Sequence, residues 1–282
     1  MITRNLPGRY HVVSFWSQQS TKNYAAPKVR RDILKISQEL GVDIVDIGEN
    51  QLSGLESRLK DEKAKAKSMN KKLATFIQYP LKPFFDISMP FTTDAFHLVD
   101  LVNEISERRI VLVHDIKSIQ KGMFDKPIDR FQFDRVHDFE SFLFSSADRL
   151  IVHSQPMANY VASHFQVRNQ RIIPLGMFDY LGTQVPTEIS RPNLTSIAFA
   201  GYLGYGKRSL VEKLFDGLPV VPGRTYKLYG PDFQNEDFFR EDIQYRGSID
   251  PDELPLVLNT ENSAGLLWDV LDDRQRFYYR EV

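Results

Sequence analysis

Residues 10–47, YHVVSFWSQQSTKNYAAPKVRRDILKISQELGVDIVDI, contain the pattern that decides the fold. The first seven of them, YHVVSFW, form a short β-branched and aromatic run, which predicts a buried strand. Apolar side chains then recur at positions 29, 33, 36 and 40, which is the spacing of an amphipathic helix over residues 28–40. Gly41 ends this helix, and residues 42–47 predict the next strand. The stretch is therefore a strand–helix–strand unit.

The same alternation continues through the first half of the chain. Further strands are predicted at residues 73–78, 110–114 and 150–153, and helices at residues 94–107, 134–144 and 157–164. Strands separated by helices of this length imply β–α–β units and a parallel sheet. We therefore expect residues 1–172 to form one Rossmann-like α/β domain.

Residues 173–194 differ in character, because prolines and glycines break every periodic pattern there, and we interpret them as a linker between domains. The strand–helix rhythm then restarts. Strands are predicted at residues 196–200, 225–229, 243–246 and 265–268, and helices at residues 208–215 and from residue 251 onward, where Asp250 can cap the helix. The pattern stops after Asp269. Residues 195–282 are therefore expected to be a second Rossmann-like domain that is incomplete, lacking at least one helix and strand.

Composition and charge disfavour several classes of protein. The chain has 36 basic and 37 acidic side chains, so it lacks the overall basic field expected of a nucleic-acid binder. It has no cysteine, which excludes disulfides and thiolate metal sites. No secretion signal and no run of about 20 apolar residues is present, so we expect a cytoplasmic protein that at most rests on the inner face of the cell membrane.

Ligands of open parallel sheets bind beyond the carboxyl ends of the strands, so the loops after the strands hold the candidate residues. The loop after the first predicted strand is polar and leads into a helix N-terminus, which favours an anion. Its candidate side chains are Ser17, Gln18, Lys22 and Asn23. A plain surface connection explains this loop equally well.

The loop at residues 200–207, AGYLGYGK, follows the first strand of the second domain. Its three glycines let the backbone approach a ligand closely, and the ammonium of Lys207 suits a diphosphate. The P-loop spacing GxxxxGK[ST] is absent, and a tight turn is the alternative interpretation.

Two further candidates stand at strand ends. His114 and Asp115 follow the strand in IVLVHDI, and a carboxylate beside an imidazole could remove a proton from a hydroxyl. The alternative is that Asp115 caps a turn and His114 packs at the rim. Asp269, in GLLWD, could hold sugar hydroxyls or cap a following helix. His153 also ends a strand, but Ser154 is interpreted as a helix N-cap, which favours a structural role there.

Two other patterns have structural interpretations. The remaining histidines show no metal-ligand spacing, so no metal site is expected. The lysine-rich run at residues 60–72 could meet anionic lipid or a phosphorylated acceptor, but acidic residues within it favour a solvated helix face.

Six segments occur in order along the chain: IVLVHDI, DRLIVHSQPMANYV, IAFAGYLGYGK, YKLYGPDF, YRGSIDPDELP and GLLWD. Together they resemble bacterial sugar transferases of the group that includes the galactofuranosyltransferases and the glucosyltransferase that extends glycans on streptococcal adhesins. The resemblance runs in order over residues 10–269. It implies the GT-B architecture, in which two Rossmann-like domains with parallel sheets face each other across a cleft.

The resemblance also implies a donor site in the second domain. The loop with Gly201, Tyr202, Gly204 and Lys207 would contact the donor diphosphate, and Tyr229, Gly230 and Asp269 would lie near the nucleotide sugar. Two departures affect this site. Family members usually carry Asn in place of Tyr202. They also continue past the Trp-Asp element into an Asn-Pro-His-Lys-like helix start that this chain does not contain.

The implied activity is transfer of a hexose (galactofuranose, glucose or galactose) from a UDP-sugar to a glycan, a lipid-linked polysaccharide precursor or a glycoprotein. No metal or other cofactor is expected, and Asp115 would be the base of an inverting reaction. The alternative is an inactive transferase-like binding subunit of a glycosylation complex. An NAD-dependent epimerase is disfavoured, because SQQSTKN stands where GxGxxG belongs. Relatives suggest self-association; sugar, acceptor and stereochemistry stay open.

Overall fold

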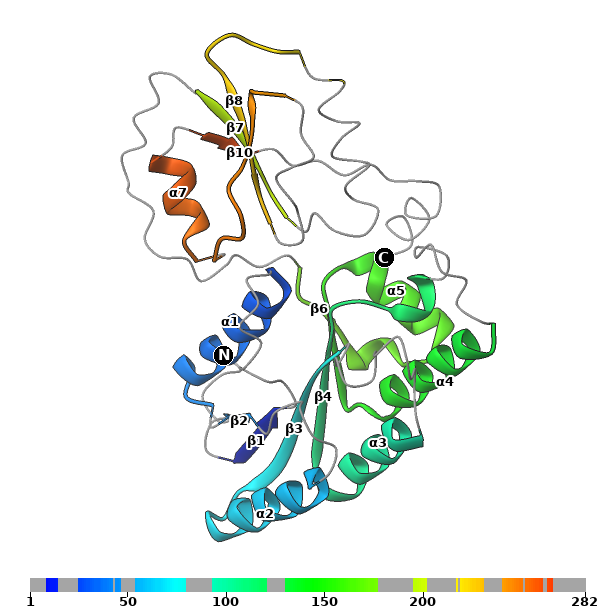
Figure 1. Ribbon diagram of the computed structural model, residues 1–282. Coiled ribbons are helices and arrows are strands. Elements are labelled where there is room, and N and C mark those ends of the chain that lie inside the picture. Colours follow the sequence, from blue (N-terminus) through cyan, green and yellow to red (C-terminus); the bar gives the residue numbers. More distant parts are fainter. Residues whose placement is uncertain are drawn as a thin grey trace. The chain divides into compact units, whose positions relative to one another are not determined.

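A computed structural model describes two compact units, each built on one parallel β-sheet (Figure 1). The residues described are 9–14, 25–42, 44–46, 54–79, 93–120, 130–176, 195–201, 217, 219–230, 240–250, 252–260 and 263–265.

The first unit contains a six-stranded sheet in the order β2-β1-β3-β4-β5-β6, with every neighbouring pair parallel. Its strands are β1 (Tyr10–Ser14), β2 (Ile44–Asp46), β3 (Lys72–Tyr79), β4 (Arg108–Val113), β5 (Arg149–Val152) and β6 (Ile172–Pro174). Its α-helices are α2 (Leu55–Ser68), α3 (Thr93–Ile105), α4 (Arg130–Ser146) and α5 (Gln155–His164), together with the part of α1 (Ala25–Glu39) that begins at Ile33. Its described residues also include two short 3₁₀ turns, η2 (Lys117–Gln120) and η3 (Asn169–Arg171).

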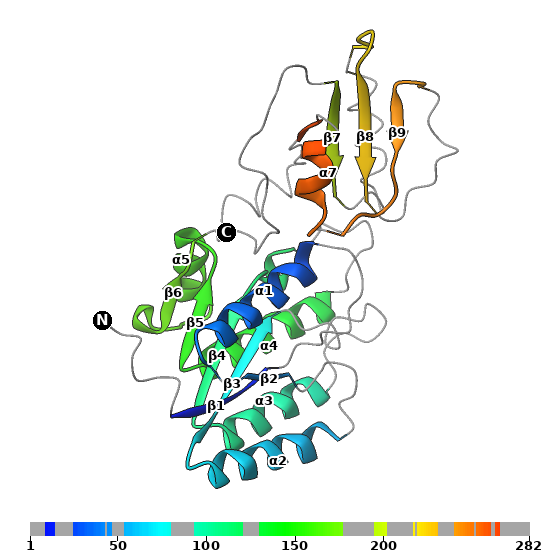
Figure 2. The ribbon, with the colours of Figure 1, turned by 90° about the vertical axis from the view of Figure 1, so that its left-hand side faces the viewer.

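Helices cover both faces of this sheet. The larger core cluster joins α2, α3, α4 and α5 to one face, and the smaller cluster joins Leu34 of α1 to the other, so that α1 lies in front of the strands in Figure 2. Side chains of β3 alternate between the two clusters: Ile77 belongs to the larger and Phe76 to the smaller. A central parallel strand is expected to be apolar on both faces for this reason.

The strand order places a switch point at β1. The chain passes from β1 to β2 on one side and then returns to β3 on the other. In doubly wound sheets, the crevice beyond the carboxyl ends of such strands is the usual ligand site.

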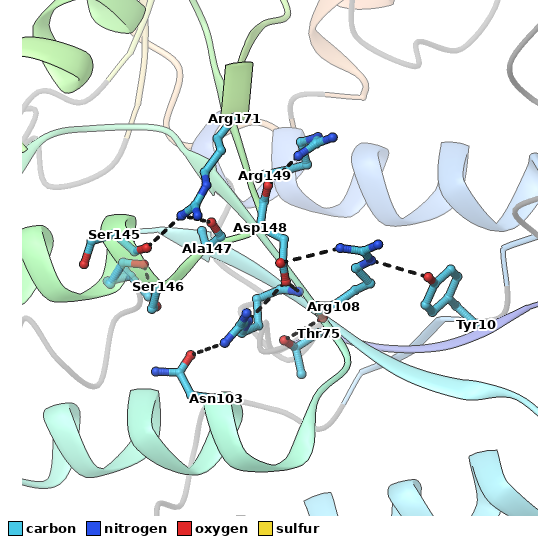
Figure 3. Close-up of polar contacts among 12 residues, drawn as sticks. Tyr10, Thr75, Asn103, Arg108, Ser145, Ser146, Ala147, Asp148, Arg149 and Arg171 are labelled. Carbon is cyan, nitrogen blue, oxygen red and sulfur yellow. Dashed lines mark hydrogen bonds and ion pairs between the residues drawn. The ribbon is translucent and has the colours of Figure 1, made fainter. Parts of the chain in front are cut away.

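The opposite, amino-terminal edge of the sheet is fixed by a network around Asp148, which lies between α4 and β5 (Figure 3). Its carboxylate accepts hydrogen bonds from the backbone N of Arg109 at 2.9 Å and from Arg109 Nε at 3.1 Å. Arg171 Nη1 donates to the backbone oxygen of Ser145 at 3.1 Å, near the end of α4. Burial alone would raise the pKa of Asp148, but the hydrogen bonds from Arg109 outweigh it and hold that pKa below its ordinary value. The start of β4 is thereby tied to the turn that precedes β5.

The second unit contains a four-stranded parallel sheet in the order β10-β7-β8-β9. The strands are β7 (Ser196–Ala200), β8 (Thr225–Tyr229), β9 (Ile243–Tyr245) and β10 (Ser263–Gly265), and α7 (Leu254–Thr260) precedes β10. Here the strand order reverses at β7, between β8 on one side and β10 on the other. The predicted fold class, α/β with two Rossmann-like parallel sheets, is confirmed.

Some boundaries differ from those expected. Ile172–Pro174 pairs with β5 as β6, so the first sheet extends two residues into the segment interpreted as linker. β10 begins at Ser263, two residues before the predicted strand, and α7 begins at Leu254 rather than at residue 251. Asp250 still caps the turn before α7, because its side chain accepts a hydrogen bond from the backbone N of Asp252. The predicted helix at residues 208–215 lies outside the described residues.

The lysine-rich run belongs to α2 as far as Ser68. Its buried positions are Leu55, Leu59, Glu62 and Ala66, while its lysines face solvent, as the interpretation of a solvated helix face requires. Among the helices that the structure describes, none is both long enough and apolar enough to cross a bilayer.

Candidate active site

The carboxyl edge of β3, β4 and β5 brings together three polar side chains. In the sheet register, Tyr79 pairs with Val113, and Val113 pairs with Val152. His114 and His153 directly follow these paired positions and therefore lie side by side.

Gln78, His114 and His153 form a hydrogen-bonded chain. The distance from His114 Nε2 to Gln78 Oε1 is 3.0 Å, and that from His114 Nδ1 to His153 Nε2 is also 3.0 Å. An amide oxygen only accepts, so His114 Nε2 donates to the fully buried Gln78. In neutral His114 the Nδ1 atom is then an acceptor, and His153 Nε2–H donates to it.

This contact limits the charge that the pair can carry. A nitrogen-to-nitrogen hydrogen bond needs one lone pair, so only one of the two imidazoles can be protonated while the contact exists. Burial lowers the pKa of His153, and the nearby charge of Asp115 opposes that effect only in part. His153 is therefore predominantly neutral at pH 7.

Asp115 lies at the accessible side of this edge. Its side chain is 42% exposed, and Lys117 Nζ lies 3.4 Å from its Oδ2 atom. The carboxylate is thus partly exposed, and the ammonium of Lys117 lies beside it. This arrangement suits a group that accepts a proton from a hydroxyl.

A second carboxylate near this edge, Glu140 of α4, is fully buried. It accepts hydrogen bonds from Tyr79 OH at 2.8 Å, from the backbone N of Lys117 at 2.6 Å and from the backbone N of Ser118 at 3.1 Å. Burial raises its pKa to about 7, although these hydrogen bonds act in the opposite direction. The pKa of Tyr79 is raised well above its ordinary value, first by burial and then by the charge of Glu140.

Sequence reasoning identified only part of this site. It singled out His114 and Asp115, which the structure places at the sheet edge. It favoured a structural role at His153 and did not consider Gln78 or Glu140. A signal for Glu140 did exist. Within α4 the apolar positions 136, 139, 143 and 144 form a buried stripe, and Glu140 is the one carboxylate inside it.

In the second unit, Gly201 directly follows β7 at the switch point. Its backbone N donates to the oxygen of Tyr229 at 2.9 Å. A Cβ atom at position 201 would lie 3.2 and 3.3 Å from two carbons of the Phe199 ring, so the ring leaves room only for glycine unless it shifts. Packing against Phe199 therefore accounts for glycine at this position.

Two further predicted donor residues, Tyr229 and Gly230, lie at the end of β8. The side chain of Tyr229 is buried, so this residue presents only its backbone at the edge. Gly230 donates from its N to the oxygen of Gly247 at 3.0 Å, and its own oxygen accepts a hydrogen bond from Tyr245 OH at 2.7 Å. Both contacts come from β9 and the residues directly after it, and they fix the backbone after β8.

The other predicted site residues lie outside the described residues and stay predictions. They are Ser17, Gln18, Lys22, Asn23, Tyr202, Gly204, Lys207 and Asp269. Within the described ranges, no three His, Asp or Glu side chains gather in a way that could hold a metal ion.

Comparison with known proteins identifies the family. The family described as "Glucosyltransferase 3-like, N-terminal domain" matches residues 9–177, which span the whole six-stranded sheet and the Gln78–His114–His153 chain. A comparison with curated proteins gave no match. Since the family match covers more than half of the 282 residues, the chain belongs to the glucosyltransferase 3-like family of glycosyltransferases.

Proposed function

We propose that this protein transfers a hexose from a UDP-sugar to a hydroxyl group of a glycan, a lipid-linked saccharide or a glycoprotein, as a metal-independent enzyme of GT-B type. The observation that carries the proposal is the accessible carboxylate of Asp115 at the carboxyl edge of the family-matched sheet. Galactofuranose, glucose and galactose are the candidate sugars. The reaction would belong to surface-polysaccharide or glycoprotein assembly in the cytoplasm, at the inner face of the membrane.

In the proposed reaction Asp115 is the general base. Its carboxylate accepts the proton of the acceptor hydroxyl as that oxygen forms a bond to the anomeric carbon. The bond from this carbon to the diphosphate oxygen breaks at the same time, and UDP leaves with the bonding electron pair. An inverted anomeric centre follows from this single displacement.

The leaving diphosphate would be stabilised by the loop that begins at Gly201. Backbone N–H groups and the ammonium of Lys207 supply positive charge there, so the proposal gives no role to a metal ion. Tyr202, Gly204 and Asp269 complete the proposed donor site, and Gly230 contributes backbone atoms. The polar loop with Ser17, Gln18, Lys22 and Asn23 is proposed to contact the acceptor.

Thermal unfolding with added nucleotides tests the donor site, because a ligand that binds only the folded state raises the midpoint. We expect UDP, UDP-glucose or UDP-galactofuranose to raise it, NAD to have no effect, and Lys207→Ala to abolish the response. Lys63→Ala, at an exposed position of α2, is the matched control and should respond like the wild type. A response to NAD alone, or to none of the UDP compounds, would contradict the proposal.

Sugar transfer itself tests the base. With a labelled UDP-sugar and lipid-linked or glycan acceptors, Asp115→Asn should lower kcat by about 100-fold or more while leaving UDP binding intact. Binding of UDP-sugar by a wild-type protein that transfers nothing to any acceptor would instead favour the inactive binding subunit.

A further inference from the structure

Glu140 is a carboxyl group on the buried, apolar face of α4. Val136, Phe139, Leu143 and Phe144 of the same helix face are buried apolar side chains, and an apolar residue at position 140 would avoid the cost of burying a carboxyl group. Glu140 instead gathers three hydrogen-bond donors, one from the end of β3 and two from the start of η2. The carboxyl group thus joins α4, β3 and the segment after β4.

The backbone is held by hydrogen bonds both before and after Asp115. On one side, the backbone N of His114 donates to the oxygen of Tyr79 at 2.8 Å. On the other side, the N–H groups of Lys117 and Ser118 donate to Glu140, which is itself bonded to the hydroxyl of Tyr79. Between these attachments, only Asp115 turns outward, because Ile116 is fully buried.

We propose that Glu140, supported by Tyr79, is a positioning residue that fixes the backbone at residues 114–118 and thereby holds the Asp115 carboxylate where it meets the acceptor hydroxyl. This inference rests on the proposed function, in which Asp115 is the base. Glu140 does not reach the reacting atoms, because it is fully buried and its carboxylate is bonded to Tyr79 and to the backbone of Lys117 and Ser118. A displacement of about 1 Å in a catalytic group can lower the rate about 100-fold, so a fixed backbone has direct value for the chemistry.

Glu140→Gln is the informative substitution. Glutamine has the same shape and keeps one accepting oxygen, but its NH₂ group cannot accept the second backbone N–H. We expect kcat for sugar transfer to fall by about 10- to 100-fold, with the donor KM within about twofold of wild type and the UDP-induced thermal shift retained.

Two companion variants distinguish a loss of Asp115 positioning from a general loss of structure in the first unit. Glu62→Gln changes another buried carboxylate of the same unit, whose partners are His11 and Lys65 and not η2, and should leave kcat unchanged. Tyr79→Phe keeps the ring packed against Phe144 and both backbone bonds to Glu140, and should give a smaller loss of kcat than Glu140→Gln. Tyr79→Phe also serves if Glu140→Gln does not fold.

Amide hydrogen exchange reports on the attachment without requiring activity. At least one of the N–H groups of Lys117 and Ser118 should exchange faster in Glu140→Gln than in wild type, and both should exchange at the wild-type rate in Glu62→Gln. Unchanged exchange at both amides in Glu140→Gln would overturn the attachment.

A double-mutant cycle connects the attachment to the base. If Glu140 acts through Asp115, Glu140→Gln should lower kcat little further in the Asp115→Asn background, so the two effects are not additive. Fully additive effects, or wild-type kcat in Glu140→Gln with faster exchange, would overturn the positioning role and leave the proposed function standing. Wild-type kcat in Asp115→Asn would overturn the base assignment itself, and the positioning role with it.

Discussion

His114 Nδ1 and His153 Nε2 lie 3.0 Å apart, so one hydrogen joins two imidazoles at the edge where the candidate base stands. The ring centroids are 5.1 Å apart and the planes are inclined by 36°. We predict that the pair takes up at most one proton while the contact exists, because a second proton would break it. Imidazole ¹⁵N spectra should show one shared step as the pH is lowered; two separate complete steps in the folded protein would contradict the prediction.

The same pair makes the first unit less stable in acid. The pKa of His153 is lowered by burial, so the unfolded chain binds a proton at this residue more readily than the folded protein. Its contribution to stability is therefore present above its ordinary pKa of 6.5 and is lost as the pH falls below it. In urea unfolding, the free energy of unfolding should fall less between pH 7 and pH 5 in His153→Gln than in wild type. An equal loss in both proteins would contradict this.

The shifted pKa of Glu140 should make stability fall as the pH rises, which is opposite to the effect of His153. Its pKa rises from an ordinary 4.5 to about 7 in the folded protein, so the folded state holds a proton that the unfolded chain releases at lower pH. The contribution to stability is present below pH 4.5 and is lost as the pH rises through about 7, by an amount up to about 3 kcal/mol. Urea unfolding at pH 5 and pH 8 should show this decline in wild type and not in Glu140→Gln. The same decline in both proteins would assign it to other groups.

Glu62 and His11 provide a third test in the same unit. His11 Nε2 lies 2.6 Å from Glu62 Oε2, and both side chains are buried. Burial raises the pKa of Glu62, but hydrogen bonds from Lys65 and His11 outweigh it, so the net pKa is lowered and stability is lost as the pH falls below 4.5. Glu62→Gln should lower the free energy of unfolding at pH 7 by about 1–3 kcal/mol. Glu56→Gln, which breaks an exposed pair with Lys60 on the same helix, should change it little.

Gly201→Ala tests the close approach at the end of β7. The added Cβ requires the Phe199 ring to move by a few tenths of an ångström, so we expect a stability loss of about 1 kcal/mol and a clearly weaker UDP-induced thermal shift. Gly217→Ala is the matched control, since its Cβ would meet no heavy atom within 4 Å. Equal UDP-induced thermal shifts in the two variants would show that Gly201 is not part of the donor site.

The sequence predicted where the strands lie better than it predicted which strands pair with each other. The expected strands at residues 196–200 and 225–229 coincide with β7 and β8, because each is a short apolar run between turn-forming residues. The N-cap assigned to Ser154 is also confirmed, since its Oγ accepts from the backbone N of Met157 at 3.1 Å. β6 has only three residues and includes Pro174, so nothing local distinguishes it from a loop. Its pairing with β5 depends on the tertiary fold.

The same limit applies to the site. His114 and Asp115 are neighbours in the sequence and could be noticed there, whereas His153 lies 39 positions from His114 and Gln78 lies 36 positions away. Only the parallel register of β3, β4 and β5 places them together. Glu140 is recognisable in sequence as a charge within an apolar stripe, but its partners on η2 are not.

Helix α4 and the turn after it are bonded to both ends of β4: Glu140 holds the backbone after the strand, and Asp148 holds Arg109 near its start. For protein engineering, residues 108–148 are therefore one exchangeable cassette. A chimera of two family members that takes this block whole, together with a tyrosine at position 79, inherits a base and its support from the same parent. A crossover placed between residues 118 and 140 joins a base from one parent to a support from the other, and such recombinants should be folded but poor catalysts.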